Sequence, residues 1–398
     1  MEMSVRYLLV AMAVMLGVGA QAQPPAPSVD TIVPANECRT PSAMIAFDFD
    51  GASASACAIL GEREFAVLVS PEHAPPINPS PWYAFRYEST GDAPVTITLR
   101  YLGGKHRYTP KWNGGGGWRE LVADVADDGE AARLRVPGGT GMIAAQEVIA
   151  QDNHAADLRR WSAATGAPVF TLGRSHDGRP VEALRLGRAD APKLVVLLGR
   201  QHPPEVTGAI AMQAFVDELV AIAGRDPGLG ADTQFLIVPL INPDGTARGH
   251  WRANRGSVDL NRDWGDFAQP ETRAVKAWLD ALPAPVRPVL MIDFHSTTRN
   301  LFYVQGDEAS AVQQRFLAAW LAGREDEFAG YPFTIEPRNA NPDSGTAKNW
   351  FYATYDIPAY TYEVADTADR SAARRAAGDL AASLITALAE LGRYTKAR

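Results

Sequence analysis

The chain has 398 residues, of which 46% are hydrophobic and 21% are charged, and its formal net charge is −8 at pH 7. This composition is typical of a globular protein, and the length favours two domains over one. The negative charge argues against a basic surface that would follow a phosphate backbone, so we expect no nucleic-acid partner. With only two cysteines in the chain, any metal ion must be held by His, Asp and Glu.

Residues 1–22 have the pattern of a signal peptide. Arg6 supplies a positive charge, residues 8–20 form an apolar run, and Ala-Gln-Ala at 20–22 matches a small-x-small cleavage site. The apolar run is shorter than the roughly 20 residues needed to cross a bilayer. We expect no other segment to be long and apolar enough to cross a membrane. The sequence therefore predicts an exported protein, periplasmic or secreted, without stable membrane insertion after cleavage.

Residues 23–42 are predicted to form a linker, because prolines at 24, 25, 27 and 34 disfavour regular structure. The two cysteines, Cys38 and Cys57, could form one disulfide in an oxidising compartment, or remain as two buried thiols.

Residues 43–150 are expected to form an antiparallel β-sandwich. Large apolar residues recur at every second position over 64–69, 82–87 and 95–101, and glycine-rich turn signals such as 114–117 separate such segments. This alternation is typical of half-buried antiparallel strands.

Residues 155–398 show a different pattern, with continuous apolar runs at 194–199, 235–241 and 289–294 and helical patterns between them. Apolar runs of this length are typical of strands buried on both faces. The sequence predicts an α/β domain with a mixed, largely parallel sheet and helices on both faces. Functional residues in such sheets collect at the carboxyl ends of the strands.

Possible metal ligands follow two of these runs. His202 and Glu205 come just after the run 194–199, and His295 follows the run 289–294. Two histidines and one carboxylate leave a fourth position open on a zinc ion, which is the catalytic arrangement. The His-x-x-Glu spacing alone is weak, since a glutamate at a helix start also complements the helix dipole.

Other polar residues suggest substrate contacts. Arg252 and Arg262 could bind a carboxylate or stabilise an oxyanion, although arginines are more often surface charges. Glu363 is embedded in a short β-prone run, where a charge is costly unless it has a partner or a role. Beside zinc it could accept a proton from water, whereas on an edge strand it would simply face solvent.

Six motifs in fixed order carry a family resemblance: HPPE (202–205), NPDG (242–245), HWR (250–252), DLNRDW (259–264), FHS (294–296) and YTYE (360–363). In this order they resemble the zinc metallocarboxypeptidases of the carboxypeptidase A superfamily. The β-rich N-terminal region and the proline after the first histidine resemble the cytosolic-carboxypeptidase subgroup. The resemblance spans about residues 60–390 and implies the zinc carboxypeptidase fold for residues 155–398.

The resemblance also implies residue roles. One Zn²⁺ would be bound by His202, Glu205 and His295. Arg252 would polarise the scissile carbonyl and hold its oxyanion, while Asn261 and Arg262 would grip the C-terminal carboxylate of the substrate. Glu363 would act as general base and then as proton donor to the leaving amine.

Two positions bear on substrate choice. When the sequence is aligned with the resembled family on Trp350 and Glu363, Lys348 falls at the floor of the pocket for the side chain of the substrate's C-terminal residue. The resemblance therefore implies a preference for C-terminal Glu or Asp. The alternative is that Lys348 is a surface lysine. The loop tyrosine that many relatives carry 22 residues before the base is replaced by Asn341, and the nearby Tyr352 and Tyr355 are expected in the core.

The sequence thus predicts an exported zinc exopeptidase that acts on peptide or protein C-termini. One alternative is a zinc-dependent N-acyl-amino-acid hydrolase of the desuccinylase or aspartoacylase kind, which would share the His-x-x-Glu…His site. Another is a zinc-containing binding protein that has lost catalysis; the presence of Arg252 and Glu363 argues against it.

Overall fold

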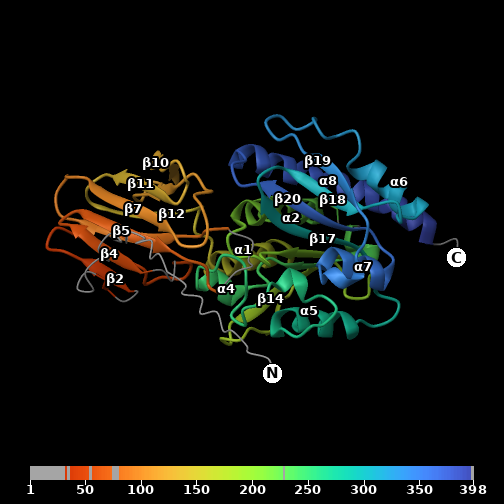
Figure 1. Ribbon diagram of the computed structural model, residues 1–398. Coiled ribbons are helices and arrows are strands. Elements are labelled where there is room, and N and C mark those ends of the chain that lie inside the picture. Colours follow the sequence, from red (N-terminus) through yellow and green to blue (C-terminus); the bar gives the residue numbers. More distant parts are fainter. Residues whose placement is uncertain (1–31, 34–35, 53–55, 74–79, 227–228, 396–398) are drawn as a thin grey trace, which may run out of the picture.

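The computed structural model describes residues 32–33, 36–52, 56–73, 80–226 and 229–395. The predicted signal peptide lies outside these residues. The described chain forms two units that lie side by side (Figure 1). We call strands β1 to β12 the β unit, and helix α1 with all later elements the α/β unit.

The β unit consists of two six-stranded sheets, with strand orders β1-β4-β5-β7-β11-β10 and β2-β3-β6-β12-β8-β9. Its strands are β1 (Ile32–Val33), β2 (Glu37–Arg39), β3 (Ala43–Ala46), β4 (Cys57–Gly61), β5 (Glu64–Val69), β6 (Ala84–Ser89), β7 (Val95–Tyr101), β8 (Lys111–Asn113), β9 (Arg119–Glu120), β10 (Ala123–Val125), β11 (Ala131–Val136) and β12 (Thr140–Ala144). The pairs are antiparallel except for β5 and β7, which run parallel. Apolar side chains from both sheets form one buried cluster.

Strands β1 and β2 fall within the stretch 23–42 that was predicted to be a linker. β2 pairs with β3, and its Cys38 is fully buried. Cys38 forms a disulfide with Cys57 of β4, so the bond joins the two sheets. The prolines that suggested a linker do not prevent these strands, because none of them lies within β1 or β2.

The α/β unit contains one eight-stranded sheet of order β13-β14-β16-β15-β17-β20-β18-β19. Its strands are β13 (Val169–Arg174), β14 (Pro180–Leu186), β15 (Lys193–Gly199), β16 (Thr233–Val238), β17 (Arg287–Thr297), β18 (Leu301–Gln305), β19 (Thr334–Arg338) and β20 (Ala359–Ala365). Strands β16, β15, β17 and β20 are parallel neighbours, and β18 and β19 are parallel to each other. The remaining pairs are antiparallel. The mixed, largely parallel sheet confirms the predicted fold class.

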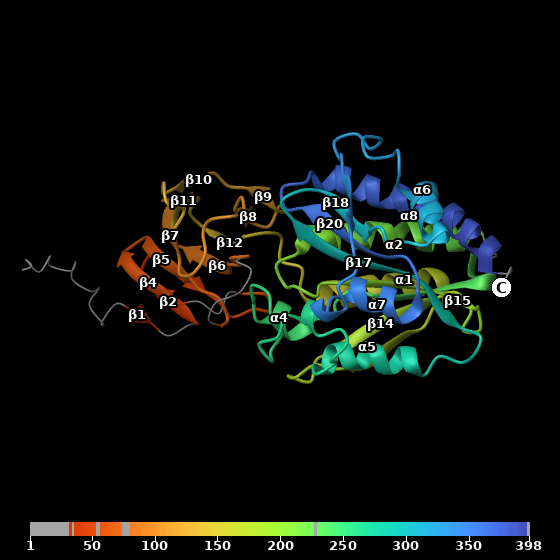
Figure 2. The ribbon, with the colours of Figure 1, turned by 45° about the vertical axis from the view of Figure 1, so that its right-hand side comes forward.

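Helices cover both faces of this sheet (Figure 2). They are α1 (Gln151–Thr165), α2 (Val206–Arg225), α3 (Leu229–Asp232), α4 (Pro243–Ala247), α5 (Pro270–Asp280), α6 (Ala311–Trp320), α7 (Ala347–Tyr355) and α8 (Arg370–Thr395), with short 3₁₀ turns η2 (Leu260–Arg262) and η3 (Pro342–Ser344). Helices α1, α2, α6 and α8 bury apolar residues on one face, and α5 and α7 do so on the other. Helix α1 begins at Gln151 and packs on α2, so the α/β unit starts slightly before the predicted residue 155.

Helix α2 is the one described helix that is long and apolar enough to span a membrane, with a mean hydropathy of 1.5. The expectation that no other segment would be long and apolar enough to cross a membrane was therefore wrong for α2. In the structure α2 lies between the sheet and α8. A helix enclosed in this way needs apolar residues around most of its circumference, so its hydropathy is explained by burial within the protein.

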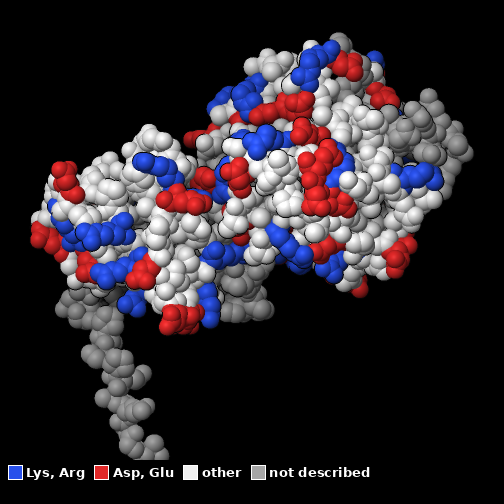
Figure 3. All heavy atoms as spheres, turned by 90° about the horizontal axis from the view of Figure 1, so that it is seen from above, with Lys and Arg blue, Asp and Glu red and all other residues white. Residues whose placement is uncertain are grey.

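The two units share a continuous interface. The side chains of Val206, Ile210 and Trp251, from the α/β unit, belong to the apolar cluster of the β unit. Ion pairs join Arg107 to Asp366 at 2.8 Å, Arg370 to Glu147 at 2.9 Å and Arg179 to Asp50 at 2.8 Å, in each case between the two units. Viewed from above, acidic and basic side chains are interspersed over both units (Figure 3).

Candidate active site

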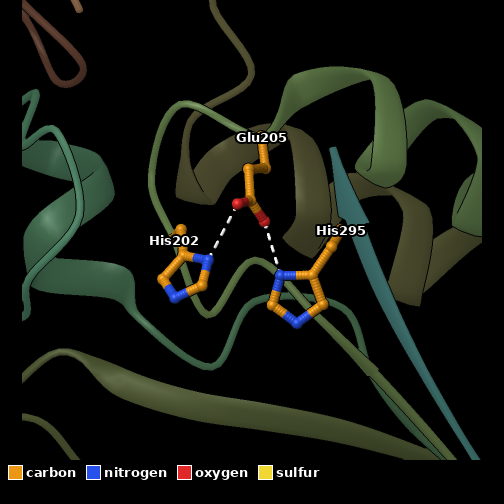
Figure 4. A group of neighbouring side chains, drawn as sticks. All are labelled: His202, Glu205 and His295. Carbon is orange, nitrogen blue, oxygen red and sulfur yellow. Dashed lines mark hydrogen bonds and ion pairs between the residues drawn. The ribbon is translucent and has the colours of Figure 1, made fainter. Parts of the chain in front are cut away.

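The candidate metal ligands meet where two parallel strands end. His202 and Glu205 lie in the loop between β15 and α2, and His295 is near the end of β17. Because β15 and β17 are neighbours, their carboxyl ends bring these side chains together. The three side chains are buried, and one ligand atom from each lies within 4.8 Å of the others (Figure 4). The close approach of α2 to β17 requires Gly208, where an added Cβ would lie 2.4 Å from the His295 carbonyl oxygen.

Each histidine is held between two carboxylates. The Nδ1 atoms of His202 and His295 face the two oxygens of Glu205 at 2.8 and 2.7 Å. The Nε2 atoms face Asp259 Oδ1 at 2.8 Å and Asp293 Oδ2 at 2.7 Å. Carboxylates placed behind histidines fix their ring orientation and leave the other nitrogen for a metal. Both Nδ1 atoms and the Glu205 carboxylate therefore converge on one point.

This donor set fits a zinc ion. Two imidazole nitrogens and one carboxylate are the ligands of many catalytic zinc sites, which keep a fourth position for water or substrate. Burial alone would raise the pKa of Glu205, but the attraction of His202 and His295 outweighs it and holds this pKa well below its usual range. The carboxylate is thus ionised, as a ligand must be.

Glu363 lies beside the ligands. It is on β20, directly opposite His295 in the adjacent parallel strand. Its Oε2 has no hydrogen-bond partner among the described residues, and its side chain lines the same cleft as the ligands. Burial raises the pKa of Glu363 to about 7. A carboxyl group with such a pKa can accept and return a proton near neutrality.

Arg252 is oriented toward the ligands by a shared carboxylate. Its Nε donates to Asp259 Oδ2 at 2.7 Å, while the other oxygen of Asp259 faces His202. Asp259 therefore links the guanidinium to a zinc ligand.

Asn261 and Arg262 lie in η2, next in the chain. The Asn261 Oδ1 accepts from the backbone N–H of Ala347 at 2.9 Å, and Arg262 Nη1 donates to the Asn261 carbonyl at 2.6 Å. Gly345 has a φ of +65° and lies so close to Arg262 that a Cβ would be 2.3 Å from its carbonyl oxygen. Both side chains line one cleft of about 520 Å³, together with Arg252, Glu363 and the three metal ligands.

Lys348 lines this cleft as well, in the first turn of α7. It is only 5% exposed, so it is not the surface lysine that was the alternative. Its Nζ donates to the Arg338 carbonyl at 2.9 Å. Burial lowers the pKa of Lys348 to about 8, partly opposed by the charge of Glu308.

The model of the family "Zinc carboxypeptidase" matches residues 165–376, which is more than half of the chain. The chain belongs to the zinc carboxypeptidase family. His202, Glu205 and His295 form a zinc site typical of this family and hold one zinc ion.

Relatives of this zinc carboxypeptidase include the cytosolic carboxypeptidases 6 of Caenorhabditis elegans and Mus musculus. The first is 29% identical over 185 residues, which cover 43% of this chain and 40% of the relative; the second is 28% identical over 207 residues, which cover 48% and 38%. The chain thus spans about two fifths of the length of these curated relatives.

Solved structures show the same fold across both units. A metallo-carboxypeptidase from Burkholderia cenocepacia has a TM-score of 0.70 at 20% identity, covering 89% of this chain and 100% of that one. A metallo-carboxypeptidase from Pseudomonas aeruginosa has a TM-score of 0.67 at 21% identity, covering 87% and 99%.

The structure also places residues in or behind the site that the sequence analysis missed. Asp259 and Asp293 support the zinc ligands, and both could have been found, since carboxylates commonly accompany metal-binding histidines. Tyr303 of β18 lines the cleft. Tyr352 and Tyr355 were expected in the core, but they are only partly buried and pack against the apolar cluster that contains Phe351 of α7.

Other missed residues come from the β unit. Ser80 and Arg107 line the cleft, and Arg107 Nη1 donates to Ser80 Oγ at 2.8 Å. Ser80 lies in the segment NPSPWYAFRY (78–87), which contributes to the resemblance to the cytosolic-carboxypeptidase subgroup, but no role was assigned to it. Arg107 stands in none of the motifs that carry the resemblance, so no sequence signal identified it. Asn341, at the place of the loop tyrosine, instead accepts from the Asp343 N–H at the start of η3.

Proposed function

We propose that this protein is a zinc-dependent carboxypeptidase that removes C-terminal residues from peptides. The observation that carries the proposal is the position of Glu363, one of whose carboxylate oxygens has no hydrogen-bond partner in the described part of the chain, beside three convergent zinc ligands. A proton acceptor next to an open metal site is the arrangement needed to hydrolyse an amide with water.

When bound, zinc supplies Lewis-acid polarisation of the scissile carbonyl and lowers the pKa of water in the site. Glu363 accepts the proton of the attacking water and later donates it to the leaving amine. Its raised pKa suits both steps, because a group that titrates near the working pH can both take and give a proton. Acyl transfer to an enzyme side chain is not required.

Arg252 stabilises the negative charge that develops on the carbonyl oxygen. Its guanidinium is oriented by Asp259 rather than free to rotate, and a donor held in place before the reaction is worth more than a mobile one. Asn261 and Arg262 hold the α-carboxylate of the substrate, since a planar guanidinium matches a carboxylate with two parallel hydrogen bonds.

Lys348 gives the side-chain pocket a preference for acidic residues. It is buried on the wall of the cleft and donates one hydrogen bond to a main-chain carbonyl. An ammonium has three donors, which leaves capacity for a substrate carboxylate. A positive charge in a partly desolvated pocket favours Glu or Asp over an apolar or basic residue.

The test is turnover of peptides ending in Glu, Leu and Lys, compared with N-acylated amino acids, using zinc-loaded and chelator-treated protein. We expect zinc-dependent release of the last residue, fastest from Glu. Hydrolysis of N-acyl amino acids alone would favour an acyl-amino-acid hydrolase, and no turnover with zinc bound would favour a binding protein.

We also propose that the protein is exported. The signal-peptide pattern of residues 1–22 motivates this, and the disulfide between Cys38 and Cys57 supports it, because disulfides persist in oxidising compartments. The N-terminal sequence of the mature protein should begin at Gln23, and cell fractionation should recover it outside the cytoplasm. An intact N-terminus on cytoplasmic protein would contradict export.

A further inference from the structure

One carboxylate of the β unit binds the main chain that carries Arg252. Glu72, in the loop after β5, accepts from three consecutive backbone N–H groups: Trp251 at 2.8 Å, Arg252 at 2.9 Å and Ala253 at 2.6 Å. Hydrogen bonds to an ionised acceptor are stronger than those between neutral groups. Burial alone would raise the pKa of Glu72, but the hydrogen bonds from the amides of Ala253 and Trp251 are the main effects that outweigh it and lower the pKa, so the carboxylate is charged at neutral pH.

The β unit also holds this segment by its side chain. Trp251 is 1% exposed and belongs to the apolar cluster of the β unit. Its ring lies so close to Gly104 that an added Cβ there would be 3.0 Å from two ring carbons. The segment 251–253 is therefore bound through its main chain by Glu72 and through Trp251 by the β-unit core.

The guanidinium of Arg252 is held by a residue of the α/β unit. Its Nε donates to Asp259, which also faces the zinc ligand His202. The position of the guanidinium is thus determined at two ends, by the β unit at the backbone and by the α/β unit at the side chain. Loss of either contact would displace it relative to the zinc ligands.

We propose that Glu72 is a positioning residue for Arg252, through which the β unit becomes part of the catalytic machinery. Glu72 itself does not line the cleft and is not expected to touch substrate. The inference rests on the proposed function, in which Arg252 stabilises the oxyanion. Displacement of such a donor by about 1 Å can lower the rate about 100-fold.

The variants are Glu72→Gln, which keeps the shape but presents an N–H₂ group to at least one amide donor, and Glu72→Asp, which keeps the charge and shortens the side chain. The matched control is Glu88→Gln. Glu88 is a half-exposed glutamate of the β unit, and its ion-pair partner Arg86 also pairs with Asp48, so Arg86 keeps a partner when the charge of Glu88 is removed. All variants are compared with wild type for zinc content and thermal unfolding.

The first measurement is amide hydrogen exchange, by mass spectrometry, of peptides that contain residues 251–253. We expect faster exchange in Glu72→Gln, an intermediate rate in Glu72→Asp and no change in Glu88→Gln. Unchanged exchange in both Glu72 variants would overturn the proposal, and this result does not depend on activity.

The second measurement is a double-mutant cycle with Arg252→Ala. Glu72→Gln should lower kcat/KM about 10-fold or more in the wild-type background, mainly through kcat, with zinc content unchanged. In the Arg252→Ala background the same change should cost less than about 2-fold, because the residue it positions is gone. Equal losses in both backgrounds would overturn the proposal. A wild-type protein that cleaves no peptide would overturn the proposed function, while hydrogen exchange would still decide whether Glu72 anchors the segment.

Discussion

Glu363 lies directly opposite His295 in the register of the parallel strands β20 and β17. Side chains at such positions point to the same side of a sheet and lie near each other. One strand thus carries a zinc ligand, and its neighbour carries the group proposed as proton acceptor. The pairing of the two strands sets the distance between them.

Glu363→Gln should separate proton transfer from metal binding. The amide cannot accept the proton, so turnover should fall about 10²-fold or more, whereas His202, Glu205 and His295 are untouched and zinc content should stay near one per chain. Steady-state kinetics and metal analysis of the purified variant check this.

The matched control is Glu218→Gln, because Glu218 is on α2 and pairs with the exposed Arg225 away from the cleft. Normal turnover by Glu363→Gln would show that another residue is the base.

Asp293→Asn should weaken zinc binding. Asp293 Oδ2 faces His295 Nε2 at 2.7 Å, and replacement of a carboxylate behind a metal-binding histidine typically costs about 10- to 100-fold in affinity. Competition with a zinc chelator measures the change, and His295→Ala gives the limit of full loss. An affinity equal to that of the wild type would mean that Asp293 does not support the ligand.

The preference for acidic C-termini should depend on pH through Lys348. Its pKa is lowered to about 8, so the ammonium is charged below that pH and neutral above it. The ratio of kcat/KM for peptides ending in Glu to those ending in Leu should therefore be high at pH 6–7 and fall as pH rises through about 8. Taking the ratio cancels the pH dependence of kcat/KM that comes from Glu363 and from the metal site, because these groups affect the cleavage of both peptides equally.

Two variants test the assignment of this pH dependence. Lys348→Met should lower the Glu/Leu ratio and make it independent of pH, and Lys348→Asp should lower it further. If the ratio is unchanged in Lys348→Asp, or if Leu or Lys termini are cleaved best by the wild type, Lys348 does not select the substrate.

Loss of the disulfide should destabilise the β unit. Cys38 and Cys57 are separated by 19 residues and join the two sheets, and a bridge closing a loop of this length contributes about 3 kcal/mol. Denaturant unfolding of the Cys38→Ser/Cys57→Ser variant, compared with oxidised and reduced wild type, measures the difference. Equal stability of oxidised and reduced protein would contradict this prediction.

The sequence alone was sufficient to predict the fold class from its apolar runs, and its six ordered motifs identified the zinc ligands through the family resemblance that they carry. Strands β15, β16 and β17 are buried on both faces, so they appear as continuous apolar runs, and His202 and His295 could be assigned to the carboxyl ends of two of them. Local patterns of this kind can be recognised without knowing which elements pack together, because they reflect only the burial of a strand and the direction of the chain. Short or irregular elements carried no such pattern, and strands β1 and β2 were missed for that reason.

Only the tertiary structure decided how the two units cooperate. Glu72 lies 179 residues before the first amide it accepts from, and Arg107 lies 259 residues before Asp366. Neither glutamate nor arginine is unusual in a loop, so the sequence alone does not distinguish these two from solvent-facing charges. Such contacts depend on the packing of one complete unit against another, which brings together residues that have no relationship along the chain. The chemistry of the zinc site was therefore readable from local motifs, while its support by the β unit was determined by the fold.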